Sequence, residues 1–315
     1  MANMRIRDIS PRLTFQAQNA ATSQKVELAD RLIAAGVSAI ELSSFVSPKL
    51  VPGLADAEAV FAQVRRREGV SLECCVGNVT GLRRAIDAGA HAAWFLLSAD
   101  EEFSKNNIGR TIEDSLEELG RMCEVASSSD IRLGTYMISI FGGPGGLPRA
   151  PHQMKDVASR LTELGVYDWI LADSCGYAAP PQMRDMVTFA ARLTGKDHLT
   201  VQVHDSRGMG LANIAQLVEL GVGNIDTSLA GSGGHPAMAD APVGGVCSED
   251  AVQMLELMDV HTGVDLAALI EAANWLDSIL GGQEKGFARH VGKVPLNAAE
   301  VESARVFQRP FKWSK

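Results

Sequence analysis

The feature that most constrains the fold is a regular alternation of short apolar runs with longer helical patterns. Eight runs have the length and composition of β-strands: residues 5–9, 39–43, 71–76, 92–97, 132–140, 169–173, 200–204 and 224–228. The segments between them repeat apolar residues at helical spacing: residues 23–35, 55–66, 80–88, 112–127, 151–164, 180–193, 208–220 and 248–258. Strands separated by helices pair in parallel through right-handed crossovers. Eight such units predict a closed (β/α)8 TIM barrel.

Glycines mark the ends of four of these helical patterns. Gly36, Gly89, Gly165 and Gly221 each precede a predicted strand, which suits the left-handed residue just beyond a helix. An open, doubly wound sheet would show the same local signals, but eight strand candidates favour closure. We therefore expect one domain over residues 1–315, with the barrel at about 4–262 and a C-terminal helix and tail over 263–315.

Composition excludes several classes of function. The chain has 29 basic and 38 acidic residues, and the net charge of −9 argues against nucleic-acid binding. No apolar run has the length of a membrane span, and the N-terminus has no apolar signal core. The five cysteines lack disulfide or metal-site spacing. We expect a cytoplasmic homo-oligomer that acts on a small molecule and binds neither nucleic acid nor membrane.

Polar residues gather where the predicted strands end. Gln202 and His204 point to the same side of their strand, and two such groups at the end of an apolar strand are costly unless they have a role. Active sites of TIM barrels lie at this end of the strands. The polar residues there are Arg12, Glu41, Ser43, Asn78, Ser98, Ser139, Asp173, Gln202, His204 and Thr227, and the next loop adds His235.

Several fragments carry a resemblance to a known family. They are residues 44–49, 104–107, 171–174, 204–208, 228–236, 248–250 and 261–264. In this order they resemble the 3-hydroxy-3-methylglutaryl-CoA lyase family, from about Pro11 to Asn274. The resemblance implies a TIM barrel and retro-aldol cleavage of a β-hydroxy acyl-CoA, with a divalent metal that holds the substrate oxygens.

The resemblance also shows which parts of the family's site are replaced. Of its four metal ligands, the Asp position is Leu13, the first His is Gln202, and the Asn position falls on Gly245. His204 alone matches a ligand, and the family's reactive Cys is His235. Leucine cannot bind a metal and an amide is a poor substitute for imidazole. We therefore assign no cofactor, and a divalent ion (Mg²⁺ or Mn²⁺) is disfavoured.

The part of the family's site that handles anions is retained. The resemblance implies that Arg12 stabilises an oxyanion, that Glu41 orients Arg12, and that Asp173 is the family's strand-6 Asp. The alternative for Arg12 and Glu41 is a buried ion pair. His204 is either a general base or a structural histidine. Asp173 either orients His204 or accepts backbone hydrogen bonds.

The remaining candidates have two or three interpretations each. His235 is a loop-borne acid, a replacement ligand or a surface residue. Cys175 is a nucleophile paired with His204 or a buried packing residue. The expected substrate-binding residues are Gln202, Ser43, Asn78, Ser139 and Thr227, with Lys49 and Asn107 near the phosphates of CoA or merely solvated.

Three functions remain open at this point. The first is a metal-independent carbon–carbon lyase or aldolase that acts on a hydroxy acyl-CoA or hydroxy acid, with His204 as base and Arg12 as oxyanion stabiliser. The second is the family's metal-dependent lyase with a ligand set rebuilt from His204, His235, Asp173 or Glu41. The third is a barrel that only binds an acyl-CoA or a small acid.

Overall fold

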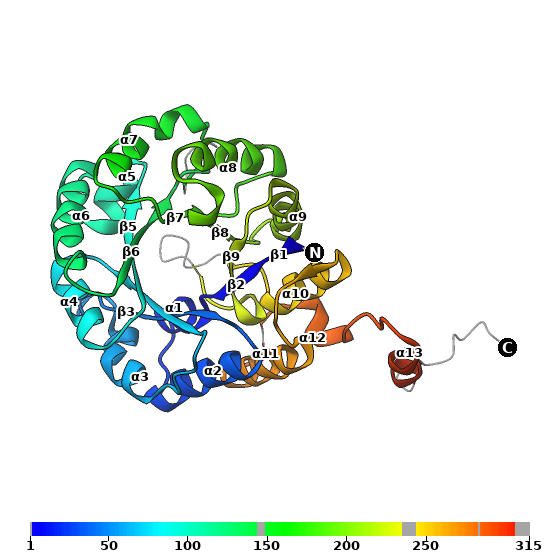
Figure 1. Ribbon diagram of the computed structural model, residues 1–315. Coiled ribbons are helices and arrows are strands. Elements are labelled where there is room, and N and C mark those ends of the chain that lie inside the picture. Colours follow the sequence, from blue (N-terminus) through cyan, green and yellow to red (C-terminus); the bar gives the residue numbers. More distant parts are fainter. Residues whose placement is uncertain (1, 144–148, 235–243, 283, 306–315) are drawn as a thin grey trace.

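The strands form a closed parallel barrel, as the alternation predicts. The computed structural model describes residues 2–143, 149–234, 244–282 and 284–305. The barrel consists of β2 (Arg5–Asp8), β3 (Ala39–Ser44), β4 (Ser71–Val76), β5 (Ala92–Ser98), β6 (Arg132–Ile138), β7 (Trp169–Asp173), β8 (Leu199–Val203) and β9 (Asn224–Thr227). β9 pairs with β2, with Ile225 opposite Ile6, and this pairing closes the ring (Figure 1).

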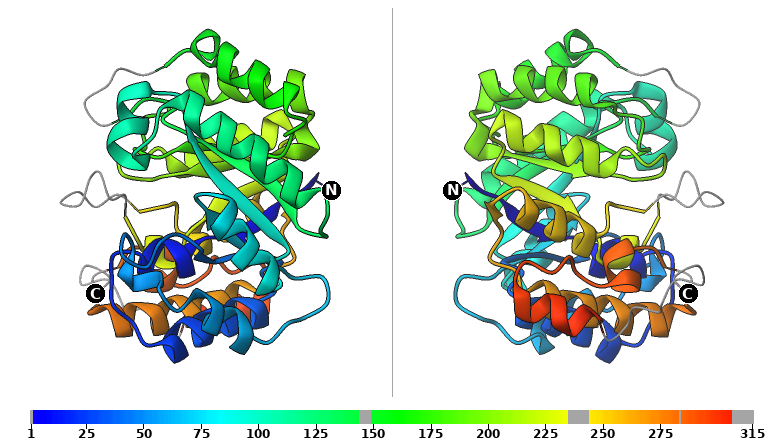
Figure 2. Two further views of the ribbon diagram at one scale, coloured as in Figure 1. Left: turned by 90° about the vertical axis from the view of Figure 1, so that its left-hand side faces the viewer. Right: turned by 90° about the vertical axis from the view of Figure 1, so that its right-hand side faces the viewer.

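Helices surround the barrel on its outside. They are α2 (Thr22–Ala34), α3 (Ala57–Gln63), α4 (Val79–Asp87), α6 (Ile112–Ala126), α7 (Lys155–Glu163), α8 (Pro180–Thr194), α9 (Gly210–Leu220) and α10 (Ser248–Leu257). The two side views in Figure 2 show them flanking the strands. Outward-facing strand residues such as Val201 and Val203 pack with these helices in the main apolar core. Because this core holds each strand in register, the strand ends form a fixed rim for a site.

Several boundaries differ from the sequence prediction for identifiable reasons. β6 ends at Ile138 rather than at residue 140 because Ser139 has a φ of 62°, which interrupts the extended chain. A short helix, α1 (Ser10–Phe15), follows β2 directly and was not predicted; Pro11 in its first turn suits a helix start. The four predicted glycine caps have left-handed φ values between 70° and 89°.

The N- and C-terminal segments add structure beyond the barrel. β1 (Ala2–Asn3) pairs in parallel with β10 (Val260–His261). The predicted C-terminal helix is α11 (Leu266–Leu280), which contacts α2 and α10. The segment predicted as a tail contains α12 (Phe287–Val291) and α13 (Ala298–Arg305), and α13 stands apart from the ring of helices (Figure 1). In the described part of the chain, no helix combines the length and apolarity needed to span a bilayer.

Candidate active site

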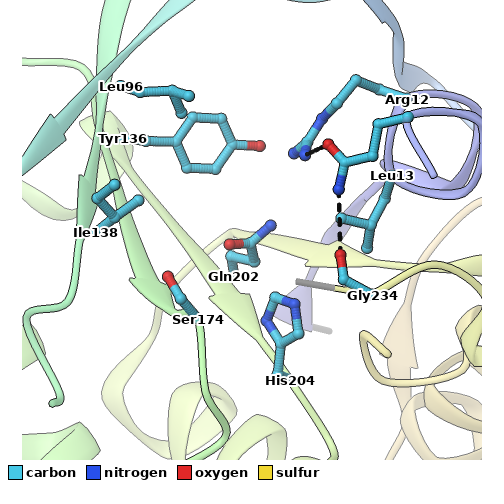
Figure 3. Close-up of a pocket in the computed structure, with 10 residues that line it drawn as sticks. Arg12, Leu13, Leu96, Tyr136, Ile138, Ser174, Gln202, His204 and Gly234 are labelled. Atoms are coloured by element: carbon cyan, nitrogen blue, oxygen red, sulfur yellow. Dashed lines mark hydrogen bonds between the residues drawn. The ribbon is translucent and has the colours of Figure 1, made fainter. Parts of the chain in front are cut away.

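A pocket opens at the carboxyl ends of the strands. The residues that line it are Arg12, Leu13, Gln16, Leu96, Tyr136, Ile138, Ser174, Gln202, His204 and Gly234. Figure 3 shows Leu96 and Ile138 across the pocket from Arg12, with Gln202 and His204 between the two sides. The pocket therefore has an apolar wall and a wall that carries a guanidinium, which suits a small substrate with an anionic group.

β8 positions Gln202 and His204 as the strand period predicts. Gln202 pairs with Ala172 on β7 and with Asp226 on β9, and Ala172 belongs to the apolar cluster inside the barrel. His204 follows β8 and forms an isolated bridge with Gly245. Backbone bonds from Asp205 to Gly244 (3.0 Å) and from Val246 to Val203 (3.1 Å) attach the segment after β9 to this strand end. Both side chains are buried and both reach the pocket.

Arg12 is held at the pocket by Glu41. The Nε of Arg12 donates to Oε2 of Glu41 at 2.5 Å, and its Nη1 lies 3.4 Å from Oε1 of Gln16. Burial alone would raise the pKa of Glu41, but the charges of Arg12 and Arg7 lower this pKa to about 2. Glu41 is therefore an anion at neutral pH. Because it binds Arg12 through Nε, the far end of the guanidinium remains directed at the pocket that Arg12 lines.

A layer of charged side chains lies below the pocket inside the barrel. Arg7 donates to Glu41, Glu73 and Asp226, each at 2.6 Å. The Tyr136 hydroxyl accepts from Arg7 at 2.9 Å and lies 2.9 Å from Glu41. The interior of such barrels is ordinarily filled by branched apolar residues. This barrel instead contains a buried guanidinium that joins side chains from four of its strands.

Asp173 does not take the role of orienting His204. Its Oδ1 accepts the backbone N–H of Tyr177 at 2.8 Å, and its Oδ2 accepts that of Ala178 at 3.2 Å. The register pairs Asp173 with Val203, whose side chain faces the surrounding helices. Asp173 thus points out of the barrel and shapes the loop after β7, which is the second of the two predicted alternatives. Burial raises its pKa to about 6.

Most of the expected substrate-binding residues lie outside the pocket lining, and Gln202 is the exception. Asn78 caps α4 by accepting from the N–H of Gly81 at 2.8 Å. Thr227 shares a hydrogen bond of 2.7 Å with Ser248. Ser43 pairs with Cys74, which belongs to the outer core. These contacts fit a structural role, because a polar residue at a strand end can equally satisfy the backbone or a neighbouring hydroxyl, and the binding of substrate by these three residues stays a prediction.

For three more predicted residues, the structure shows no contact that bears on substrate binding. Ser139 is buried, and its hydroxyl has no hydrogen-bond partner among the described residues. Lys49 is exposed in the loop after β3, which fits the solvated alternative and leaves its contact with CoA a prediction. Asn107 belongs to a π-helical turn (Ser104–Ile108) and its side chain is outside the description, as is the whole of His235.

Cys175 fits the packing alternative. It is buried, and burial raises the pKa of its thiol to about 11. A thiol that stays protonated at neutral pH is a poor nucleophile. Its backbone carbonyl accepts hydrogen bonds from Ser206 at 2.7 Å and Arg207 at 2.6 Å, so the residue has a local structural function.

Sequence reasoning did not identify six of the ten residues that line the pocket. The pocket residues it did not single out are Gln16, Leu96, Tyr136, Ile138, Ser174 and Gly234, and below them it missed Arg7, Glu73 and Asp226. A signal for the charged layer was present. Strands buried on both faces normally read as continuous apolar runs, whereas Arg7, Glu73 and Asp226 place charges inside the predicted strands 5–9, 71–76 and 224–228.

The described residues do not fit the divalent ion that the family resemblance implies. Leu13 fills the position of the expected Asp, and its Cγ lies 2.6 Å from where a Cβ on Gly233 would be. Gln202 and His204 supply one amide and one imidazole. The carboxylate oxygens of Glu41 and Asp173 already accept hydrogen bonds, from two arginines and from backbone N–H groups respectively. Among the described residues no group of three or more His, Cys, Asp or Glu side chains could hold a metal.

Comparisons with known proteins agree with this architecture. The family model described as HMGL-like matches residues 3–276. The chain is 35% identical over 281 residues to the 3-hydroxy-3-isohexenylglutaryl-CoA/hydroxy-methylglutaryl-CoA lyase of Pseudomonas aeruginosa, which covers 88% of this chain and 93% of that protein. It is 33% identical over 275 residues to the human mitochondrial hydroxymethylglutaryl-CoA lyase, with 87% and 84% covered.

Solved structures show the same likeness. The hydroxymethylglutaryl-CoA lyase of Pseudomonas aeruginosa superposes with a TM-score of 0.87 at 33% identity, over 92% of this chain and 97% of that one. An HMG-CoA lyase from Acinetobacter baumannii, in complex with coenzyme A and 3-methylmalate, superposes with a TM-score of 0.89 at 29% identity, over 94% and 97%. The family match and these carbon–carbon lyases together show that the chain belongs to the HMGL-like family.

Proposed function

We propose that this protein cleaves a carbon–carbon bond of a small hydroxy acyl-CoA or hydroxy acid by a retro-aldol reaction that needs no metal ion. The observation that carries the proposal is the pocket itself. It combines a guanidinium fixed by a buried carboxylate with an amide on β8 and an imidazole just after that strand. Two positions that supply metal ligands in the family cannot do so here, because Leu13 has a hydrocarbon side chain and Gly245 has none.

In the proposed reaction His204 removes the proton of the substrate hydroxyl. The bond between the hydroxyl-bearing carbon and the carbon next to the thioester or acid carbonyl then breaks. The hydroxyl-bearing carbon becomes a new carbonyl, and the electron pair of the broken bond forms an enolate on the other fragment. Arg12 stabilises the enolate oxygen. The protonated His204 returns the proton to the enolate carbon, which balances the reaction. The amide of Gln202 is placed to hydrogen-bond a substrate oxygen.

The relatives indicate which substrates to test first. The two curated relatives described above are named lyases of hydroxymethylglutaryl-CoA, one of them also of an isohexenyl analogue, and one solved relative is in complex with coenzyme A and 3-methylmalate. A CoA thioester of a branched hydroxy diacid is therefore the first candidate substrate. The apolar wall formed by Leu96 and Ile138 would face its alkyl substituent. The cytoplasmic location and the homo-oligomer remain predictions.

The test compares two histidine variants with hydroxymethylglutaryl-CoA as substrate. His204→Ala should lower kcat by about 10²–10⁴-fold, the range for a lost general base. His198→Ala is the matched control, because His198 pairs with Asp168 at 2.8 Å, away from the pocket lining, and should leave kcat unchanged. Wild-type turnover by His204→Ala would remove His204 from the mechanism.

Two further measurements separate the alternatives. Full activity after removal of divalent ions with a chelator supports the metal-independent reaction, whereas activity that returns only with Mg²⁺ or Mn²⁺ establishes the metal-dependent lyase. The loss of three ligand positions also favours a binding protein without catalysis. Thermal stabilisation by CoA thioesters with no product after long incubation would establish that function.

A further inference from the structure

The charged layer inside the barrel lies directly behind Arg12, and apart from Glu41 the proposed mechanism does not use it. Arg7 is buried, with only 3% of its side chain exposed, and it contacts carboxylates from three strands. Glu41 belongs to this layer and to the pocket at once. Its Oε1 accepts from Nη2 of Arg7 at 2.6 Å, and its Oε2 accepts from Nε of Arg12 at 2.5 Å.

We propose that Arg7 is a positioning residue that fixes Arg12 in the pocket through the carboxylate of Glu41. This inference rests on the proposed function, in which Arg12 stabilises the anion of the substrate. In this inference Arg7, which lies outside the pocket, determines the orientation of the guanidinium that binds the anion.

The contacts of Glu41 show why Arg7 sets its orientation. The other partners recorded for Oε1 are the Tyr136 hydroxyl at 2.9 Å and the Cys75 thiol at 3.3 Å, which are both neutral. All three bonds end on the charged carboxylate, but only the bond from Arg7 joins two opposite charges, and it is the shortest of the three. Arg7 is therefore the strongest restraint on Oε1, and a carboxylate fixed at one oxygen has its second oxygen fixed as well.

The contacts of Arg7 show why it is itself immobile. Its three nitrogens point to Glu73 on β4, Asp226 on β9 and Glu41 on β3, and its guanidinium lies 5.1 Å from the centre of the Trp94 ring. The planar fork of arginine presents three separate nitrogens to the three carboxylates, whereas lysine carries its three donors on one nitrogen and cannot reproduce these positions. A displacement of about 1 Å at a reacting group can cost about 100-fold in rate.

The test is a double-mutant cycle on kcat/KM with hydroxymethylglutaryl-CoA. Arg7→Lys keeps the charge and loses the fork, and it should lower kcat/KM about 100-fold in the wild-type background. In an Arg12→Met background it should cost less than about 3-fold, because the residue through which Arg7 acts is gone. A purely structural role for Arg7 predicts the same loss in both backgrounds, and that result would overturn the proposal.

The matched control is Arg5→Lys. Arg5 lies on the same strand and is 3.8 Å from Glu73, but no contact with Glu41 is recorded for it in the described part of the chain. It should change kcat/KM by less than about 3-fold relative to its own parent, in the wild-type and in the Arg12→Met background alike. If Arg7→Lys does not fold, the double variant Arg7→Gln/Asp226→Asn removes one buried charge of each sign, and it should show the same dependence on Arg12.

Calorimetry with 3-methylmalate separates this proposal from the proposed function. If the wild type binds this acid without turning over any thioester, the lyase assignment fails but the cycle can be run on Kd. Arg7→Lys should then weaken binding in the wild-type background and leave it unchanged beside Arg12→Met. Equal weakening in both backgrounds would overturn the positioning role. A wild type that neither binds this acid nor turns over the thioester would overturn it too, because Arg12 would then hold no anion.

Discussion

Replacing Glu41 by glutamine tests how strongly the charged layer stabilises the fold. The substitution keeps the shape of a side chain with no exposed surface and removes the negative charge shared by Arg7 and Arg12. The pKa of Glu41 falls from 4.5 to about 2 in the folded protein, because the two arginines outweigh the effect of burial. A shift of this size is worth roughly 3 kcal/mol of stability at neutral pH.

The pH dependence of this stability has a definite sign. A carboxylate whose pKa is lowered by folding stabilises the folded state above its unfolded pKa. It loses that contribution as the pH falls from 4.5 towards 2. The difference in unfolding free energy between wild type and Glu41→Gln should therefore be about 3 kcal/mol at pH 7 and about 1 kcal/mol at pH 3.

Urea denaturation of both proteins at the two pH values measures this difference. Glu58→Gln is the control, because Glu58 pairs with Arg84 at 2.7 Å but half of its side chain is exposed. Such a surface pair should contribute less than about 1 kcal/mol at either pH. The reasoning would be refuted if Glu41→Gln lost no more stability than this control, or if its loss were the same at pH 3 as at pH 7.

Three other substitutions probe the same region. Asp226→Asn should cost at most about 1 kcal/mol at pH 7 in urea denaturation. Burial, only partly opposed by Arg7, raises the pKa of Asp226 from 3.8 to about 6, so ionisation of Asp226 disfavours the folded state increasingly as the pH rises from 3.8 through 6, and the substitution removes this cost at pH 7 but has none to remove in acid. A loss as large as that of Glu41→Gln would contradict this. Gly233→Ala should lower kcat/KM at least about tenfold, because the residue has a φ of 87° and the new Cβ would lie 2.6 Å from Cγ of Leu13. Gly69→Ala is its control, because Gly69 has a similar φ of 81° but no atom within 4 Å of the new Cβ, and this variant should leave turnover unchanged. Leu13→Asp/Gln202→His should gain affinity for Mn²⁺ in a titration and lose native activity, since the new carboxylate would compete with the substrate for Arg12; improved turnover in the metal-loaded variant would mean that the site still uses metal chemistry.

The sequence by itself determined the order and kind of the barrel elements. Strand and helix periods are local properties, and the left-handed glycines that end the helices, such as Gly165, depend only on the backbone at that position. The placement of Gln202 and His204 at one pocket followed from the same local rule. The pairing of Arg12 with Glu41 was inferred from the family resemblance, and the structure shows the contact.

Only the tertiary structure decided which polar side chains meet. Arg7 and Asp226 are 219 residues apart in the chain, and closure of the barrel between β2 and β9 brings them together. Asp173 and Thr227 looked like site residues because they end strands, yet one holds a loop and the other bonds to Ser248. Alternation along a strand fixes the side to which a residue points relative to its neighbours. Which side faces the barrel axis, and which partner lies there, depends on register and closure across the whole chain.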